Sequence, residues 1–312
     1  MSFEFRPAKR EQIPLLLGVA GGTGSGKTMS ALLLARGIAK GEPFAFIDTE
    51  NGRALMYADM FPEMQHGTIS APFRPAKYAD AIEAADAQGF PVVVVDSMSH
   101  EWAGDGGCLD WHDELMGGDQ KKNLSAWIEP KKAHKQMVTR LLQMRAHVIL
   151  AFRAEPKVEA VREGGQTKIV PKASLTGLDG WLPISEKNLP YELTASFLLM
   201  ADKPGVPQPI KLQEQHKPFV PLDRPLAEQT GAQLAAWAAG GVQAPSSAQP
   251  GEPYASEPQR RLIFAKAHEH GVDESTLRQI LAEFTGQDST AKIPRDRVDV
   301  IVEAIGLQQA AV

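Results

Sequence analysis

One glycine-rich stretch, Gly21-Gly22-Thr23-Gly24-Ser25-Gly26-Lys27-Thr28, decides the fold of this 312-residue chain. It fits the pattern G-x-x-x-x-G-K-S/T and lies between an apolar run, residues 14–20, and a helical run, residues 29–39. Glycines let the backbone turn its N–H groups inward, and the following helix adds the positive end of its dipole. The stretch therefore predicts a P-loop that binds the phosphates of a nucleoside triphosphate.

Two residues of the P-loop have specific expected functions. We expect the whole stretch from Gly21 to Thr28 to surround ATP, with Lys27 contacting the β- and γ-phosphates and acting in catalysis. The Thr28 hydroxyl should be a ligand of Mg²⁺. The alternative is a glycine-rich turn that matches the pattern by chance, and the flanking strand and helix patterns argue against it.

Apolar runs and helical patterns alternate along the first half of the chain. Runs rich in β-branched or aromatic residues cover 14–20, 44–48, 91–96 and 147–152, and helices are predicted over 27–40, 77–87 and 130–144. Pro130 occupies a first-turn position, where its missing N–H costs nothing. The alternation predicts an α/β fold with a mainly parallel sheet and helices on both faces.

The pattern changes after residue 152. Residues 158–170 centre on Gly164-Gly165 and predict a hairpin, and residues 191–201 and 208–213 predict further strands. Residues 257–267, 273–285 and 295–305 carry apolar residues at helical spacing, with Asp273 as an N-cap. Because residues 240–256 have a linker composition, we expect an ATPase domain over 1–239, a flexible linker over 240–256 and a small three-helix module over 257–312.

Composition limits the class of protein. Hydrophobic residues make up 43% of the chain and charged residues 23%, and no apolar run approaches the roughly 18 residues of a membrane span. The first ten residues contain no secretory hydrophobic segment. The single cysteine, Cys108, excludes an internal disulfide, and no Cys/His cluster has metal-ligand spacing. We expect a soluble cytoplasmic protein.

Two acidic residues follow predicted strands beside the P-loop. Asp96 ends a strand of four valines, residues 92–95, and is the predicted magnesium carboxylate. Hydrolysis also needs a base for the attacking water. Glu50 follows the strand over 44–48, whereas Ser97 occupies the place directly after Asp96. Glu50 is therefore the better candidate base, and Glu101 is the alternative base. The non-catalytic interpretation of Glu50 is a solvated cap on the segment that follows it.

These motifs resemble the ATP-binding core of RecA-like recombinases. The P-loop, Ile47-Asp48-Thr49-Glu50 and residues 92–97 carry the resemblance, which implies a RecA-like P-loop NTPase core with Glu50 as the water-activating base. Residues 96–102, 128–131 and 149–157 further resemble a group of bacteriophage RecA-like, AAA-type ATPases that includes single-strand-annealing recombinases. This resemblance extends over residues 15–219.

The chain departs from that family at one position. RecA-like enzymes commonly end the strand after the magnesium strand with a polar amide that senses the γ-phosphate, and here Phe152-Arg153 stands at that place. Arg153 is expected either to sense the γ-phosphate or to reach into the site of a neighbouring subunit. A plain surface arginine is the remaining interpretation.

Positive charge is concentrated in one block. The whole chain carries a net charge of −5, but residues 121–172 hold twelve basic and four acidic residues, a local charge of +8. DNA-binding loops emerge in this part of a RecA-like fold, so the candidate contacts to single-stranded DNA are Lys131, Lys132, Lys135, Arg162 and Lys168. The alternative is a solvated helix face and a hairpin packed on a neighbouring subunit. Only Trp127 and Phe152 supply aromatic rings there, which disfavours base stacking.

The glycine-bracketed residues 104–118 come soon after Asp96, and we interpret them as a mobile element that responds to nucleotide. His112 and Asp113 lie within this segment without the spacing of a metal site. Cys108 is interpreted as a packing residue and His100 as a structural hydrogen-bonding residue, since neither belongs to a catalytic motif.

Two classes of function remain after these inferences. The first is a Mg²⁺-dependent, DNA-stimulated ATPase of phage DNA recombination, which binds single-stranded DNA as a ring or filament of identical subunits and promotes annealing or strand pairing. A single-strand-binding protein is a further expected partner. The second is a helicase loader or other protein-remodelling ATPase whose basic face docks a protein. A small-molecule kinase is disfavoured because no lid-like arginine cluster is found, and the C-terminal module is interpreted as a partner-docking or auxiliary domain.

Overall fold

The computed structural model describes residues 12–163, 166–171, 180–240, 255, 257–285, 293–294 and 297–307. The chain divides into two compact units, residues 1–243 and 244–312. The predicted linker lies outside the described residues, apart from Gly240 and Ala255. Lys172 of the basic block also lies outside them.

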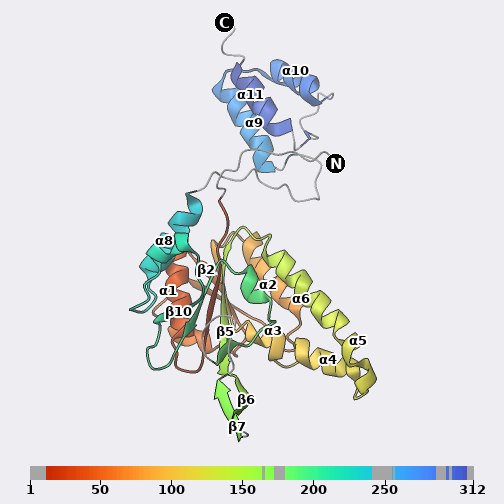
Figure 1. Cartoon of the computed structure of the whole chain (residues 1–312). Helices are drawn as coiled ribbons and strands as arrows, with labels where there is room; N and C mark the ends of the chain where they lie inside the picture. Colours follow the sequence, from red (N-terminus) through yellow and green to blue (C-terminus); the bar gives the residue numbers. More distant parts are fainter. Residues whose placement is uncertain are drawn as a thin grey trace. The chain divides into compact units, whose positions relative to one another are not determined.

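Among the described residues, one eight-stranded sheet organises the first unit (Figure 1). Its strands run in the order β10-β9-β1-β5-β4-β2-β3, and β8 pairs with the far end of β5. The strands are β1 (Leu16–Gly21), β2 (Phe44–Asp48), β3 (Met64–Thr68), β4 (Val92–Asp96), β5 (His147–Pro156), β8 (Trp181–Pro183), β9 (Ala195–Leu199) and β10 (Pro207–Lys211). Neighbours pair in parallel except for β10 on β9 and β8 on β5, which are antiparallel. The predicted α/β fold with a mainly parallel sheet is confirmed.

Helices cover both faces of this sheet. Helices α1 (Lys27–Ala39) and α8 (Glu228–Ala239) pack on one face, and α2 (Pro75–Ala87) and α6 (Ile128–Leu141) pack on the other (Figure 1). Because successive strand residues point to opposite faces, Val92 and Val94 join the core under α1 while Val93 and Val95 join the core under α2 and α6. All four valines are fully buried, as expected for a central parallel strand.

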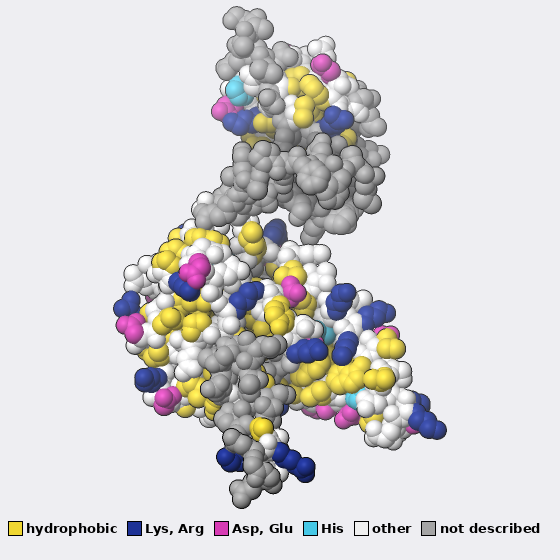
Figure 2. All heavy atoms as spheres, viewed as in Figure 1, with side chains coloured by type: hydrophobic (Ala, Val, Ile, Leu, Met, Phe, Trp, Pro, Cys, Tyr) yellow, Lys and Arg dark blue, Asp and Glu magenta, His cyan; other side chains and the backbone are white. Residues whose placement is uncertain are grey.

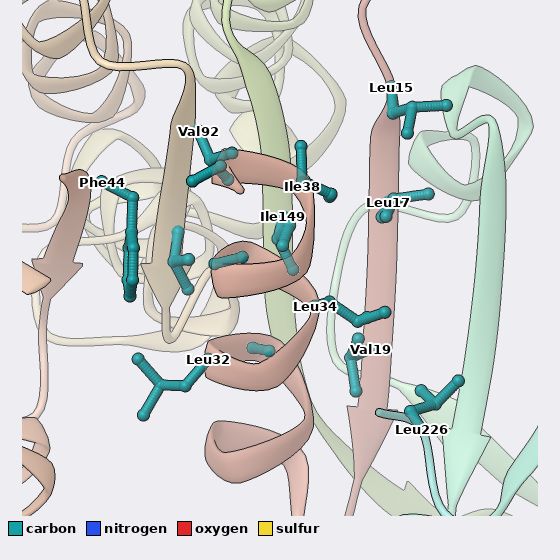
Figure 3. Packing of buried hydrophobic residues seen from close by; sticks show 14 of the residues in the cluster. Leu15, Leu17, Val19, Leu32, Leu34, Ile38, Phe44, Val92, Ile149 and Leu226 are labelled. Carbon is teal, nitrogen blue, oxygen red and sulfur yellow. The ribbon is translucent and has the colours of Figure 1, made fainter. Parts of the chain in front are cut away.

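The core beside α1 fixes the position of the helix that follows the P-loop. Figure 3 shows Leu32, Leu34 and Ile38 of α1 packed with Leu17 of β1 and Ile149 of β5. These five side chains are buried or nearly so, and each fully buried side chain of this size contributes about 1.5–3 kcal/mol. The first turn of α1 is thereby held above the edge of the sheet where the strands end.

The structure confirms most of the predicted elements, corrects one, and adds a helix within the segment that was interpreted as a mobile element. The hairpin is present as β6 (Val158–Glu163) and β7 (Gln166–Pro171), and its turn, residues 164–165, lies outside the described residues. Residues 191–194 do not extend β9, because Tyr191 belongs to the short helix α7 (Leu189–Glu192). The segment 104–118 contains a regular helix, α4 (Cys108–Met116), which begins after Gly107 and ends at Gly117.

Several elements were not predicted. Strand β3 has the sequence Met-Gln-His-Gly-Thr, which is too polar to be recognised as a strand. Helix α8 is rich in alanine and lacks a clear apolar pattern. The short helical segments are η1 (Arg53–Tyr57), α3 (Ser99–Ala103), η2 (Gln120–Lys122), α5 (Asn123–Ala126) and η3 (Glu214–Phe219). Within the described residues, we find no helix that is both long and apolar enough to cross a membrane.

Helices α1 and α8 approach each other closely through two glycines. A Cβ placed on Gly37 would overlap the carbonyl oxygen of Glu228, and one placed on Gly231 would overlap the carbonyl oxygen of Leu34. Only glycine permits backbones to meet at this separation. The crossing ties the end of the first unit to the helix that follows the P-loop.

The second unit contains three helices around its own core. They are α9 (Glu257–Glu269), α10 (Glu274–Thr285) and α11 (Val298–Leu307), and Ile263, Leu281 and Ile301 are fully buried between them. Asp273 Oδ1 accepts the backbone N–H of Thr276 at 2.7 Å, so the predicted N-cap is confirmed. This hydrogen bond is the largest of the contacts that lower the pKa of Asp273 to about 2.

We predict that Gly231→Ala destabilises the first unit. Alanine favours a helix by about 1 kcal/mol, but its methyl group would collide with the backbone of α1, and overpacking of this kind lowers the free energy of unfolding by about 1–3 kcal/mol. Urea denaturation measures the difference. Gly67→Ala is the control because a Cβ there meets no atom within 4 Å. Equal stability of the two variants would contradict the close crossing.

Candidate nucleotide and magnesium site

The P-loop connects β1 to α1 and is folded by its own hydrogen bonds. Gly24 (φ 73°) and Gly26 (φ 83°) adopt left-handed conformations that favour glycine. The buried Ser25 hydroxyl donates to the Gly22 carbonyl at 2.8 Å, and a Cβ at Gly21 would overlap the Ser25 side chain. The loop is therefore already shaped as a cradle, and its glycines fit the close approach of phosphate groups.

Lys27 lies inside this cradle. Its ammonium donates to the carbonyl of Gly22 at 2.8 Å, so the side chain folds back over the loop. Burial lowers the pKa of Lys27, while the nearby carboxylates of Asp96 and Glu50 act in the opposite direction. A partly desolvated ammonium in this position is suited to phosphate oxygens.

The magnesium ligands predicted from the sequence meet in the structure. Thr28 Oγ1 donates to Asp96 Oδ2 at 2.6 Å, although 68 residues separate them in sequence. Asp96 is 7% exposed, and burial raises its pKa, against the opposing effects of Thr28 and Lys27. A hydroxyl and a carboxylate are the hard oxygen donors that Mg²⁺ prefers, and protein sites for Mg²⁺ use only one or two carboxylates. Thr28 and Asp96 fit this ion.

Glu50 and Arg153 form an ion pair next to that site. The guanidinium of Arg153 donates to Glu50 Oε1 through Nη2 at 2.7 Å and through Nε at 3.1 Å. A cavity of about 150 Å³ is lined by Glu50 together with Thr28, Asp48 and Asp96. Thus β2, β4, β5 and α1 bring the predicted base, the predicted sensor and the magnesium ligands to one place.

Asp48 is a residue of this site that the sequence analysis did not assign. Its buried carboxylate accepts the N–H of Glu50 at 2.5 Å and the N–H of Ala54 at 3.2 Å, and lies 3.2 Å from His66 Nε2. These contacts fix the turn that presents Glu50. The signal in the sequence is the parallel with Asp96, since each aspartate ends a buried strand and the two are paired residues of β2 and β4.

The ends of β2 and β4 are also joined through Thr49. Its hydroxyl accepts the N–H of Ser97 at 2.8 Å and contacts His100 Nδ1 at 2.7 Å. Burial, more than the nearby Arg153, lowers the pKa of His100, so the ring is neutral near pH 7. His100 is therefore a structural hydrogen-bonding residue, as predicted.

Glu101 is not placed to act as the base. Its carboxylate is 1% exposed and contacts His134 Nδ1 at 2.9 Å and Cys108 Sγ at 3.3 Å instead of lining the cavity beside Asp96. Burial raises the pKa of the Cys108 thiol, and the negative charge of Glu101 raises it further. Cys108 is a protonated packing residue, in agreement with the sequence analysis.

Two segments that the sequence analysis did not connect with the P-loop lie against it. A Cβ at Gly22 would come within 3.3 Å of the Trp181 ring, so this indole packs on the loop. On the other side, the N–H of Gly205 donates to the Ser25 carbonyl at 2.9 Å. The loop is supported by β8 and by the turn between β9 and β10.

The predicted nucleic-acid contacts lie away from this site. Lys131, Lys132 and Lys135 are exposed on α6, and Arg162 and Lys168 are exposed on the β6–β7 hairpin. Figure 2 shows Lys and Arg side chains gathered over α6 and on the hairpin.

Other members of the basic block are engaged within the protein. Arg140 pairs with Asp80 and Glu83 of α2, and Arg145 pairs with Asp86. These pairs hold α6 and the start of β5 against α2, so part of the +8 charge is neutralised locally. In the part of the chain that the structure describes, no group of three His, Cys, Asp or Glu side chains is placed to hold a metal.

The sheet order, the P-loop after β1 and the aspartate at the end of β4 define a P-loop NTPase core. Residues 14–179 match the family described as AAA domain, and the chain belongs to this family, whose domain is a nucleotide-binding P-loop ATPase. No curated protein matches the chain. A similar solved structure is that of a unique ATP synthase subunit, NeqB, from Nanoarcheaum equitans, with 10% identity and a TM-score of 0.37 over 97% of this chain and 75% of that one.

We predict that Lys27→Ala abolishes tight ATP binding without unfolding the protein. The ammonium donates to the Gly22 carbonyl of the loop and does not belong to the core, so its removal should leave the fold intact. Because it lies where the phosphates would bind, its removal should weaken binding of a non-hydrolysable ATP analogue by about tenfold or more. Calorimetric titration measures the affinity, and circular dichroism checks the fold. Lys77→Ala, which removes an exposed lysine from α2, should bind like the wild type. Unchanged affinity of Lys27→Ala would refute the P-loop assignment.

Proposed function

We propose that this protein hydrolyses ATP in a Mg²⁺-dependent reaction with Glu50 as the base that activates water. The supporting observation is the position of Glu50, which lines the same cavity as Thr28 and Asp96 and whose backbone is fixed by Asp48. A carboxylate in hydrogen-bonding reach of a water at this point can accept its proton.

The other residues of the site would bind the phosphates and the metal. Lys27 and the P-loop N–H groups would hold the phosphates, and Thr28 and Asp96 would hold the metal. Bound Mg²⁺ supplies positive charge that neutralises the phosphate oxygens. Arg153 forms an ion pair with Glu50 of the same chain. This contact favours sensing of the γ-phosphate in its own subunit over insertion of Arg153 into the site of a neighbouring subunit.

We predict that Glu50→Gln retains ATP but hydrolyses it about a hundredfold more slowly or worse, as expected when a general base is lost. Single-turnover hydrolysis of radiolabelled ATP measures the rate, and filter binding measures retention. Glu101→Gln should change thermal stability and leave the rate per bound ATP close to that of the wild type, because Glu101 lies outside the cavity. The reverse pattern would transfer the base to Glu101.

For the biological activity, we propose a RecA-like protein of phage DNA recombination that binds single-stranded DNA as an oligomer of identical subunits and promotes annealing or strand pairing. The exposed lysines of α6 and the exposed Arg162 and Lys168 on the projecting hairpin support a sequence-independent contact with phosphates. A single-strand-binding protein would be a further partner, and the resemblance to phage RecA-like ATPases supports this setting.

A second candidate is a helicase loader or other protein-remodelling ATPase. It is favoured by large apolar side chains exposed along α4, α5 and the start of α6. Leu124 is 87% exposed, Ile128 is 61% exposed and Leu115 is 43% exposed. Such a group of exposed apolar residues is typical of a protein-binding surface.

We predict that removing the exposed positive charges weakens DNA binding about equally for all sequences. The variants are Lys131→Ala/Lys132→Ala/Lys135→Ala together and, separately, Arg162→Ala/Lys168→Ala. The slope of log affinity against log salt should flatten by about 0.7 for each phosphate of single-stranded DNA that the variant no longer neutralises. Fluorescence anisotropy at several salt concentrations measures both quantities. Wild-type affinity and slope in both variants would favour the protein-remodelling candidate.

A further inference from the structure

A second, larger cavity lies apart from the nucleotide site, between α6 and the segment that contains α7. Its volume is about 460 Å³, within the range of pockets that bind small molecules. It is lined by Lys131, His134, Lys135 and Val138 on α6 and by Glu186, Lys187, Asn188, Leu189 and Glu192 opposite. None of these residues lines the cavity beside Asp96.

The α6 wall is one face of a helix. Residues spaced by three, four and seven positions lie above one another on a helix, so Lys131, His134, Lys135 and Val138 point in the same direction. Lys132 is also exposed, but it does not line the cavity. Lys131 is partly oriented by the Trp127 ring, whose centre lies 5.4 Å from its ammonium.

Positive charge predominates around the cavity. Lys131 and Lys135 face it from α6, and Lys187 faces it from the opposite wall. Of the two carboxylates, that of Glu186 is turned to its own loop, where it accepts the N–H of Asn188 at 2.6 Å and its side-chain amide at 3.1 Å. The three ammonium groups exceed the two carboxylates, of Glu186 and Glu192, by one formal charge, so an anionic ligand is favoured.

The inner part of the cavity is less polar. Leu189 is 2% exposed and Val138 packs against the same core. The cavity is also lined by the buried ring of His134, whose Nδ1 is held by Glu101 at 2.9 Å. No hydrogen bond from its Nε2 to any of the described residues is present. The cavity therefore combines a cationic rim, a flat ring with one available nitrogen, and an apolar wall.

We propose that this cavity binds one nucleotide of a single-stranded nucleic acid, with the phosphate at Lys131, Lys135 and Lys187 and the base against His134, Val138 and Leu189. The inference rests on the proposed DNA-binding function and locates it. An inorganic anion would leave the apolar wall and most of the volume unused. An acidic peptide would satisfy the charges, but its carboxylates would gain nothing from the base-sized inner part.

Both walls of the cavity are connected to the nucleotide site through α3. Glu101 of α3 holds His134 on one wall, and the Ser99 hydroxyl donates to the carbonyl of Ile184, just before the other wall, at 2.7 Å. Ser99 also accepts the N–H of Arg153 at 2.9 Å. Because α3 begins three residues after Asp96, a ligand that shifts either wall acts on the elements that carry the catalytic residues. This connection provides a route for stimulation of hydrolysis by DNA.

The test measures binding of fluorescein-labelled oligothymidylate by fluorescence anisotropy, at one salt concentration, to full-length variants. Lys135→Ala and Lys187→Ala should each weaken binding about tenfold, since each loses a charged hydrogen bond. Lys77→Ala removes the same charge from an exposed position on α2, outside the cavity, and should weaken binding by no more than about twofold.

A second pair of variants tests the volume of the cavity without changing its charge. Val138→Phe places a larger side chain inside it and should weaken binding about tenfold and reduce DNA stimulation of the ATPase. Leu142→Phe, at an exposed position just beyond the end of α6, should bind like the wild type. Circular dichroism and ATP binding verify that each variant is folded, and Lys187→Ala, in an exposed loop, keeps the test decisive if Val138→Phe does not fold.

Equal losses in Lys77→Ala and Lys135→Ala, or wild-type affinity in a folded Val138→Phe, would overturn the proposal and leave general DNA binding standing. Failure of the wild type to bind oligothymidylate would reject both the cavity and the proposed DNA-binding function. Binding of polyglutamate that Val138→Phe abolishes, with no binding of DNA, would assign the cavity to an acidic protein partner instead.

Discussion

The hydrogen bond between Thr28 and Asp96 is the interaction on which the candidate nucleotide site depends. Thr28 lies in the first turn of α1, the helix that follows β1, and Asp96 ends β4. These two strands are not neighbours in the sheet, because β5 lies between them. Helix α1 must cross over β5 for its first turn to reach Asp96, and the packing of its apolar face on Leu17 and Ile149 sets that crossing. Parallel pairing then brings the carboxyl ends of β2, β4 and β5 to the same edge.

Charges of both signs are concentrated at that edge. The carboxylates of Asp48, Glu50 and Asp96 lie near the cations of Lys27 and Arg153. Each of these carboxylates is balanced differently: Asp48 by backbone N–H groups and His66, Glu50 by Arg153, and Asp96 by the Thr28 hydroxyl. Burial still raises the pKa of Asp96 despite the Thr28 hydroxyl and the nearby Lys27, which is the state expected of a carboxylate that is completed by a cation.

Much of this site followed from the sequence, because the P-loop pattern fixes both the backbone and its neighbours. The runs at 44–48 and 91–96 are apolar on both faces, so their strands and the acids after them could be located. Asp48 could not be assigned, since nothing local shows that its carboxylate turns back to the N–H of Glu50. The edge strand β3 was missed because its polar residues conceal the alternation of a strand. The segment before Ala195 was wrongly included in a strand, although Pro190 lies in the first turn of the short helix α7. The cavity between α6 and α7 joins residues some fifty positions apart, which no local pattern reveals.

The β6–β7 hairpin leaves and rejoins the domain at adjacent points. Strands β5 and β8 pair antiparallel, with Pro156 opposite Trp181, and the N–H of Lys157 donates to the carbonyl of Gly180. The segment between them therefore starts and ends at neighbouring points of the domain, whatever its length or composition. Evolution can lengthen, shorten or replace this segment without moving Arg153 or Trp181, so the hairpin can diversify while the candidate nucleotide site stays constant.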